Sequence, residues 1–416
     1  MYKNKYSRAV EEGIKLIGIG KHGSKHLPAV LVQEILVDLN EGVVGAVQKG
    51  VLFGALMTKG VERDEKLLED FIQEDVFASP EQLWNHLCWD VPLEYKPVGI
   101  KLIRGEELSY PESKTLGGFL FSDVTGEVFR GMAASILRIR YETNDEFKGL
   151  IEAVKDQYAD GFKDTTPPNA NIIQLAEPFD GVEHSYMITP ILAHYFQNMG
   201  YKILSMVSSS PGPKFTLTAK DLFLNLDCRF LKSGMDLDNS SGQFGYVIDQ
   251  KDLSPSLERW RLRRLEMVKR PFLSTIEKVL NPLKAGILIT SVFHITYMEK
   301  MIELAKMEGF AGVIVLKRGL EGSLAPYLSR ASGILCVVRT KSGDYLTREF
   351  NISDAEFSKF KSEADETVME LTLEKNLDLI NRYSKEKTSG NDEYDKRIFF
   401  ATGLYQRGVD WILSQI

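Results

Sequence analysis

The chain has 416 residues, of which 44% are hydrophobic and 26% charged, and its formal net charge is −7. This is the composition of an ordinary globular protein, and the length exceeds what one core usually holds, so we expect two or three domains. A negative net charge disfavours nucleic-acid binding by the protein as a whole, although a local basic surface remains compatible with it.

Cysteine usage and hydropathy indicate the compartment. The three cysteines, Cys88, Cys228 and Cys336, are far apart and show no metal-ligand spacing. This favours a reducing compartment over a disulfide framework. No run approaches the roughly 20 apolar residues that a membrane span needs, and the first residues contain no signal-type apolar core. We therefore expect a cytoplasmic protein that makes no membrane contact.

The first part of the chain has a helical pattern that occurs twice. Residues 7–76 place apolar side chains three and four positions apart, which is typical of amphipathic helices. A second block beginning near residue 99 repeats the first at a shift of 81 positions without a gap. The shift pairs residues of the same kind, namely Gly18 with Gly99, Leu27 with Leu108, Gly45 with Gly126, Lys49 with Arg130, Gly50 with Gly131, Leu56 with Leu137 and Lys59 with Arg140. We interpret this as the duplication of a helical unit.

These patterns define the expected domains. The two helical copies are predicted at residues 1–78 and 97–163, and a connector with two tryptophans lies between them at 79–96. A turn-rich segment, Asp-Thr-Thr-Pro-Pro-Asn at 164–169, marks the next boundary. An α/β domain with C-terminal helices is predicted for residues 164–416.

In the α/β domain, short apolar runs alternate with helical patterns, which indicates βαβ units and a parallel sheet. Strands are expected at 171–176, 202–207, 244–249, 285–294, 311–316 and 334–339. Helices are expected at 189–199, 297–308 and 397–416, and the charged segment 353–384 is predicted to be largely helical. The predicted fold class is therefore α/β, with a duplicated N-terminal helical unit and a mainly parallel central sheet.

Candidate ligand-binding residues follow from the strand positions. Ligands of open parallel sheets bind beyond the carboxyl ends of the strands. Thr189 and Pro190 open the helix after the first strand, with Thr as the expected N-cap and Pro at the first helical position. Helix N-termini and polar loops of this kind bind anions. The candidate anion ligands in this region are Thr189, Ser208, Ser209 and Ser210.

A basic segment around residues 260–278 offers further candidates. Arg264, Lys269, Arg270 and Lys278 could supply positive charge to a ligand. Trp260 is either a platform on which bases stack or a core residue, and both alternatives stay open. His294 ends a predicted strand and could act as a general base, although a structural role is favoured. The pattern identifies no catalytic residue and no metal site.

Several motifs, in this order, resemble a known superfamily. They are Arg264, Arg270, Asn281-Pro282, Ser291-Val-Phe-His294 and Gly319-Leu-Glu-Gly322, together with Gly20-Lys-His-Gly23, Thr189-Pro-Ile-Leu192 and Ala401-Thr-Gly403. The chain resembles the anthranilate phosphoribosyltransferase and nucleoside phosphorylase superfamily (glycosyl transferase family 3). It looks closest to a divergent branch with dimeric nucleic-acid-binding members. The resemblance covers most of the chain apart from the additional helical copy and the connector.

The resemblance implies a homodimer formed through the N-terminal helices, and a ligand cleft between the helical and α/β domains. It implies phosphoribosyl pyrophosphate as the ligand, bound by a Gly-rich loop after the first strand and a Lys-His-Gly-Asn-type loop after the second. Magnesium, the one cofactor implied, would be held by an Asp-Glu pair further along and would be present only if that ligand is bound.

The chain departs from the superfamily pattern at each of these loops. Residues 177–184 read Glu-Pro-Phe-Asp-Gly-Val-Glu-His, with one glycine and new carboxylates. The second strand is followed by serines rather than Lys-His-Gly, and Glu321 is the one acidic residue within 317–323. Ordinary phosphoribosyl transfer depends on such amides and on the metal.

Three hypotheses remain open. The first is an enzyme of pentosyl-transfer ancestry that acts on a phosphoribosyl or nucleotide-type ligand. The second is a non-catalytic binder of nucleic acid or nucleotides. The third is a regulatory dimer whose helices recruit a protein partner. Fold alone does not decide among them.

Overall fold

The computed structural model describes residues 6–20, 23–163, 169–238, 241–329, 332–362 and 370–416. Lys21 and His22 of the Gly20–Gly23 motif, and most of the turn expected at 164–169, lie outside the described residues. Within the described residues, no helix is both long and apolar enough to cross a membrane.

The chain divides into two compact units. Unit 1 consists of Met1–Gln157, Pro211–Pro213 and Ser256–Ser274, and unit 2 consists of Tyr158–Ser210, Lys214–Pro255 and Thr275–Ile416. The domain limits expected from sequence place 256–274 with the α/β region, whereas this segment packs in unit 1. The reason is local, because the Trp260 side chain is fully buried and its indole N–H donates to the Leu120 carbonyl at 2.8 Å.

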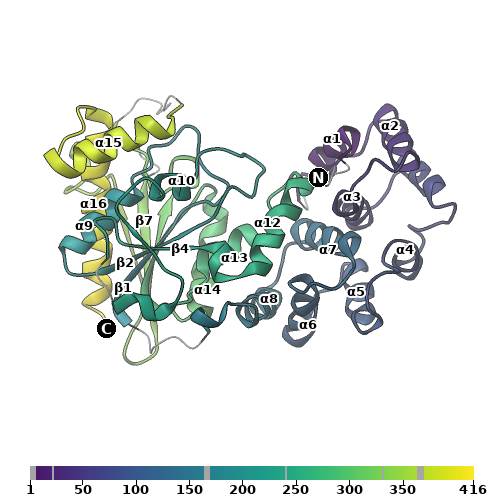
Figure 1. The fold of residues 1–416 in the computed structure, drawn as a ribbon, viewed down its shortest axis with the longest axis horizontal. Coiled ribbons are helices and arrows are strands. Elements are labelled where there is room, and N and C mark those ends of the chain that lie inside the picture. Colours follow the sequence, from purple (N-terminus) through teal and green to yellow (C-terminus); the bar gives the residue numbers. More distant parts are fainter. Residues whose placement is uncertain (1–5, 21–22, 164–168, 239–240, 330–331, 363–369) are drawn as a thin grey trace. The chain divides into compact units, whose positions relative to one another are not determined.

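Unit 1 is helical (Figure 1). Its elements are α1 (Arg8–Ile17), α2 (Ala29–Asn40), α3 (Ala46–Lys59), η1 (Glu65–Phe71), α4 (Pro80–Leu87), η2 (Leu93–Tyr95), α5 (Lys96–Ile103), α6 (Tyr110–Leu120), α7 (Glu127–Arg140), α8 (Asn144–Asp156) and most of α12 (Pro255–Met267). Helices α3 and α7 have bounds that differ by the 81 positions of the sequence repeat.

The two copies share a buried carboxylate with the same partners. In the first copy, Glu65 accepts hydrogen bonds from the amides of Leu27 and Glu62, each at 2.9 Å, and pairs with Lys59 at 2.7 Å. In the second copy, Glu146 accepts from the amides of Leu108 at 2.9 Å and Thr143 at 2.8 Å, and pairs with Arg140. Each of these residues is the repeat of its counterpart.

Helices α3 and α7 pack against each other at reciprocal glycines. A Cβ added to Gly50 would lie 1.8 Å from the Val128 carbonyl oxygen, and one added to Gly131 would lie 2.3 Å from the Val47 carbonyl oxygen. Gly131 is the repeat of Gly50, and Val128 is the repeat of Val47. The contact is therefore isologous, as in a two-fold symmetric dimer, but it lies within one chain.

Unit 2 contains an eight-stranded sheet in the order β3-β4-β2-β1-β5-β6-β7-β8. The strands are β1 (Asn169–Ala176), β2 (Lys202–Val207), β3 (Arg229–Phe230), β4 (Tyr246–Asp249), β5 (Ala285–Val292), β6 (Gly312–Lys317), β7 (Gly333–Arg339) and β8 (Tyr345–Asn351). Strands β1 to β6 pair in parallel, and β7 and β8 are antiparallel. The prediction of an α/β fold with a mainly parallel sheet is confirmed.

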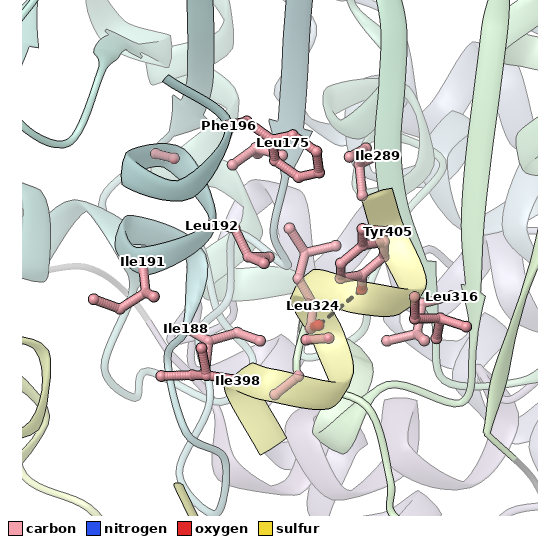
Figure 2. Close-up of a cluster of buried hydrophobic side chains, with 14 of the residues drawn as sticks. Leu175, Ile188, Ile191, Leu192, Phe196, Ile289, Leu316, Leu324, Ile398 and Tyr405 are labelled. Atoms are coloured by element: carbon pink, nitrogen blue, oxygen red, sulfur yellow. Dashed lines mark hydrogen bonds between the residues drawn. The ribbon is translucent and has the colours of Figure 1, made fainter. Parts of the chain in front are cut away.

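Helices cover both faces of this sheet. One face packs on α9 (Thr189–Asn198), α10 (Ala219–Phe223), α15 (Leu373–Glu386) and α16 (Asp392–Leu413). Figure 2 shows part of this core, where Leu175 and Ile289 of the sheet lie close to Leu192 and Tyr405 of the helices. On the other face, the Gln174 side chain donates to the carbonyl of Leu280, the residue that follows α13 (Leu273–Val279), at 2.8 Å. Helix α14 (Met298–Met307) contacts β6. The remaining helical elements of unit 2 are η3 (Asp160–Phe162), η4 (Gly234–Asp238), α11 (Gln250–Leu253), η5 (Ile295–Tyr297), η6 (Leu320–Gly322) and η7 (Ser358–Phe360).

The structure adds two strands to those predicted, and it gives the bounds of the helix predicted within 353–384. Strands β3 and β8 were not predicted, because β3 has two residues and β8 is an edge strand with mostly exposed side chains that gives no apolar run. Among the described residues of 353–384, a long helix begins only at Leu373, where Thr372 accepts the capping hydrogen bond from Lys375 at 3.3 Å.

Candidate functional site

The order in which the chain adds strands to the sheet changes direction between the neighbouring strands β1 and β5. Strand β1 pairs with β2 on one side and with β5 on the other. Ala176, the last residue of β1, is in register with Thr290 of β5. The carboxyl ends of the two strands are therefore neighbours, which is the position where open α/β sheets bind ligands. We call residues 177–188 and 293–297, which follow these two strands, the switch-point edge.

The first residue after β1 is a buried carboxylate. Glu177 is 3% exposed, and it accepts hydrogen bonds from the Thr189 hydroxyl and, at 3.2 Å, from the Leu324 amide. Burial raises the pKa of Glu177, and the two hydrogen bonds oppose this only in part. The hydroxyl of Tyr405 donates to the Leu324 carbonyl at 2.8 Å (Figure 2). These contacts fasten the start of the edge to the segment after β6.

Thr189 consequently does not have its expected role. Helix α9 begins at Thr189, and Ile188 occupies the N-cap position without a side-chain cap. The prediction of Thr189 as the N-cap was wrong, because its hydroxyl donates to Glu177 instead.

A second carboxylate reaches the edge from the loop after β6. Glu321 accepts hydrogen bonds from the amides of Glu183 at 2.7 Å and His184 at 3.2 Å, and its carboxylate lies 2.9 Å from the Lys214 ammonium. Burial alone would raise the pKa of Glu321, but the Glu183 amide and the Lys214 ammonium outweigh it and hold the pKa below its usual value. This carboxylate therefore stays ionised at neutral pH.

Two hydroxyl groups fasten the same loop. The hydroxyls of Ser185 and Ser323 lie 2.7 Å apart, and the Ser291 hydroxyl donates to the Gly322 carbonyl. The loop after β6 is thus attached to the residues following β1 and to the end of β5.

The residues after β5 form an exposed aromatic and apolar segment. Phe293, Ile295 and Tyr297 are 51%, 44% and 38% exposed. The His294 ring packs edge-on against Phe293, with ring centroids 4.8 Å apart. On the neighbouring strand, Lys317 is in register with Val292, so the exposed Arg318 follows β6 at the level where Phe293 follows β5. Sequence reasoning identified the strand end but did not select Phe293 or Arg318.

The predicted serine cluster is bonded within the protein. Ser208 donates to the Ser209 carbonyl at 2.9 Å, and Ser210 donates to the Asp180 carbonyl at 3.3 Å. The Ser209 hydroxyl accepts from Lys220 at 2.8 Å. Lys220 also pairs with Asp249, the last residue of β4, at 2.6 Å, and both side chains are largely buried.

The predicted basic residues belong to different units. Lys278, in unit 2, donates to the Ser291 carbonyl at 3.0 Å. In unit 1, Arg264 is buried and donates to the Ser274 hydroxyl at 2.8 Å, and Lys269 donates to the Lys15 carbonyl at 3.2 Å. The carbonyl of Arg270 accepts from Arg138.

Two further arginines of the basic segment are paired with carboxylates within unit 1. Arg263 pairs with Glu127 at 2.6 Å, and Arg261 pairs with Glu258 at 2.6 Å. Trp260 is a core residue, so the alternative in which it stacks on bases was wrong.

The residues present do not fit a magnesium site of the kind the resemblance implied. Across the described part of the chain, no three His, Cys, Asp or Glu side chains converge to hold a metal ion. Glu321 already receives two amide hydrogen bonds and a lysine ammonium. The Lys214 ammonium, 2.9 Å from the Glu321 carboxylate, supplies one positive charge to it.

Comparison with known proteins supports the fold. The chain is similar to the crystal structure of anthranilate phosphoribosyltransferase from Thermus thermophilus, with a TM-score of 0.55 and 16% identity, covering 75% of this chain and 88% of that one. It is also similar to the Saccharomyces cerevisiae enzyme in complex with PRPP and Mg, with a TM-score of 0.47 and 13% identity over 77% and 95% of the two chains. No family model matches the chain.

A relative by sequence is an uncharacterised protein of Aquifex aeolicus (strain VF5), 25% identical over 273 residues, which are 66% of this chain and 77% of the relative. The Thermus thermophilus structure and the sheet order define the class of fold. The chain has an anthranilate-phosphoribosyltransferase-like fold, in which a helical N-terminal part accompanies an α/β part with a mostly parallel sheet.

Proposed function

We propose that this protein binds a nucleotide-type ligand at the switch-point edge and does not transfer a phosphoribosyl group. The observation that carries the proposal is the exposed aromatic segment after β5, beside an exposed arginine after β6. Exposed aromatic rings accept bases by stacking, and a guanidinium binds phosphate through paired donors. The position at the carboxyl ends of parallel strands is the usual ligand position of this class of sheet.

The absence of transfer follows from the two carboxylates. Transfer from a pyrophosphate-bearing sugar needs amides that approach the pyrophosphate and cations that offset its charge. Here Glu321 occupies two amides of the loop after β1, and Glu177 is fixed inside the same region. The ionised Glu321 carboxylate would repel a pyrophosphate.

A small ligand is favoured over an extended strand of nucleic acid. Strand binding requires a continuous cationic groove with stacking aromatic residues. Trp260 is buried, and Arg261 and Arg263 are paired with carboxylates. The exposed aromatic rings of the switch-point edge are those of Phe293 and Tyr297, which can stack on one or two bases.

Calorimetric titration of the full chain with AMP, and separately with ribose 5-phosphate, tests this proposal. We expect AMP to bind and to lose about tenfold in affinity in Phe293→Ala, since one stacked base contributes roughly 1–3 kcal/mol. Arg318→Asn should weaken both ligands, because Asn tolerates the left-handed backbone at this position, where φ is 53°. The matched control is Trp89→Ala, which removes an exposed aromatic residue of unit 1.

The proposal fails if millimolar AMP produces no heat. It also fails if Phe293→Ala binds AMP as tightly as the native chain and the Trp89→Ala control do. Incubation with phosphoribosyl pyrophosphate, magnesium and anthranilate tests the enzymatic alternative. Formation of a phosphoribosylated product would overturn the claim that transfer is absent.

A further inference from the structure

We propose that Glu321 is an internal anion that occupies an oxyanion-binding site, and that the anionic group of the ligand binds there by displacing it. The site, called here the Glu321 site, consists of the amides of Glu183 and His184 and the ammonium of Lys214. The inference deepens the proposed function, because it assigns a second contact to the same phosphorylated ligand.

The donors of the Glu321 site have the arrangement of an anion site. Two successive backbone amides, those of Glu183 and His184, point at one carboxylate, at 2.7 and 3.2 Å. The Lys214 ammonium approaches the same oxygen as the Glu183 amide, at 2.9 Å. Successive amides with an added cation form the kind of concavity that binds phosphate.

The backbone conformation at Glu321 is one that this residue type seldom adopts. Glu321 has φ of 51° and ψ of 19°, which is the left-handed region. Side chains other than Gly, Asn and Asp are disfavoured there, and such residues persist when their surroundings compensate. The bonds to the two amides and to Lys214 provide that compensation.

The Glu321 site is accessible and adjoins the proposed base position. The Glu321 side chain is 18% exposed and that of Lys214 is 29% exposed, so solvent ions reach both groups. A Cβ added to the next residue, Gly322, would lie 3.6 Å from the Cβ of Phe293. A ligand stacked on Phe293 would therefore place a phosphate within reach of the Glu321 site.

Displacement is a competition between two anions for the same donors. While Glu321 is in place, a second anion meets a negative charge and no open amide. When Glu321 leaves, two amides and one ammonium become available together. Phosphate binding should consequently be weak in the native chain and stronger when the side chain carries no charge.

Inorganic pyrophosphate is the probe, titrated calorimetrically into the full chain. The test variant is Glu321→Gly, since glycine adopts the left-handed backbone without strain. A second variant, Glu321→Asn, keeps a polar side chain that also tolerates this conformation. We expect each variant to bind pyrophosphate at least about tenfold more tightly than the native chain, a gain equivalent to one displaced charged contact.

Two further variants test whether the gain arises at this position. Lys214→Ala in the Glu321→Gly background should abolish the gain. Glu303→Gln changes the net charge as much as Glu321→Gly does, and it removes another carboxylate paired with a lysine, 2.6 Å from Lys306. It should leave pyrophosphate binding unchanged.

The inference is overturned if the folded Glu321 variants bind pyrophosphate no better than the native chain, or if Glu303→Gln shows the same gain. Thermal unfolding of each variant establishes that it is folded. This failure is separable from failure of the proposed function. If native AMP binding depends on Phe293 but the Glu321 variants show no gain, the internal anion is refuted alone. If the variants gain pyrophosphate binding but AMP never binds, the base position is refuted alone.

Discussion

The reciprocal glycines between α3 and α7 lead to a strong prediction about stability. Replacing Gly50 by alanine would place a Cβ 1.8 Å from the Val128 carbonyl oxygen and 2.8 Å from the Met132 amide nitrogen. Both are backbone atoms of the facing helix, so no side chain can turn away, and the helices have to separate. We expect Gly50→Ala to lower the free energy of unfolding by about 3 kcal/mol or more, at the upper end of what overpacking costs.

Symmetry extends this prediction to the second copy. Gly131→Ala should be destabilising for the same reason, since its Cβ would lie 2.3 Å from the Val47 carbonyl oxygen. The double variant should be less destabilised than the sum of the single ones, because a separation that admits one methyl group also makes room for the other. Such coupling is expected for neighbouring sites that share one displacement.

The matched control is Gly118→Ala. Gly118 lies within α6, and a Cβ added there meets no atom within 4 Å. Alanine should stabilise the helix by about 0.5–1 kcal/mol. Urea unfolding followed by far-ultraviolet circular dichroism measures all four variants. If Gly50→Ala is as stable as Gly118→Ala, the close α3–α7 contact does not exist.

Two further predictions concern buried carboxylates. Glu177→Gln should gain stability relative to the native chain as pH rises above about 4.5, because the raised pKa of Glu177 stabilises the fold at lower pH and this contribution is lost as pH rises. An opposite trend in urea unfolding would contradict this. Glu65→Gln should cost about 3 kcal/mol near neutral pH, since it leaves the Lys59 ammonium, 6% exposed, without its buried partner. The pKa of Glu65 is lowered, because the Lys59 and backbone hydrogen bonds outweigh its burial, so this difference should shrink as pH falls below 4.5. Glu62→Gln, whose side chain is 61% exposed, is the control and should change stability by less than about 0.5 kcal/mol.

The repeat and the sheet could be predicted from sequence for different reasons. A duplication conserves residue spacing, so matched glycines and charges at 81 positions are visible without any structure. Buried parallel strands are apolar on both faces, so β2, β5 and β6 stand out as short apolar runs. Strand β8 has five exposed residues in succession and gives no such signal.

The same repeat shows what sequence could not supply. Spacing pairs Gly50 with Gly131, but it does not reveal that each glycine faces the backbone of the other copy. The expectation of a homodimer through these helices stays a prediction. Within unit 1, however, α3 of the first helical repeat already packs against α7 of the second repeat in the same chain. A homodimer would therefore have to use different surfaces.

The candidate site was harder to predict because the role of each polar side chain depends on its hydrogen-bond partners. Thr189, Ser208 and Ser210 are polar residues at the expected strand ends, yet each donates its hydroxyl hydrogen to an acceptor within the protein. Sequence reports which donors are present and not whether they are already engaged. Phe293 was overlooked for the converse reason, since an apolar residue next to a buried strand reads as core, whereas this one is 51% exposed.

One arrangement connects these observations. In a site that grips a pyrophosphate, the protein supplies amides and a cation, and the ligand supplies the anion. Here the protein supplies all of them, because the amides of Glu183 and His184, the Lys214 ammonium and the Glu321 carboxylate belong to one unit. Such a site is electrostatically complete without a ligand. A phosphorylated ligand would therefore have to bring additional binding free energy from elsewhere, and in our proposal the exposed Phe293 beside Gly322 provides it. Affinity should accordingly depend on the base more than on the phosphate, which is the reverse of what a phosphoribosyl-transfer site requires.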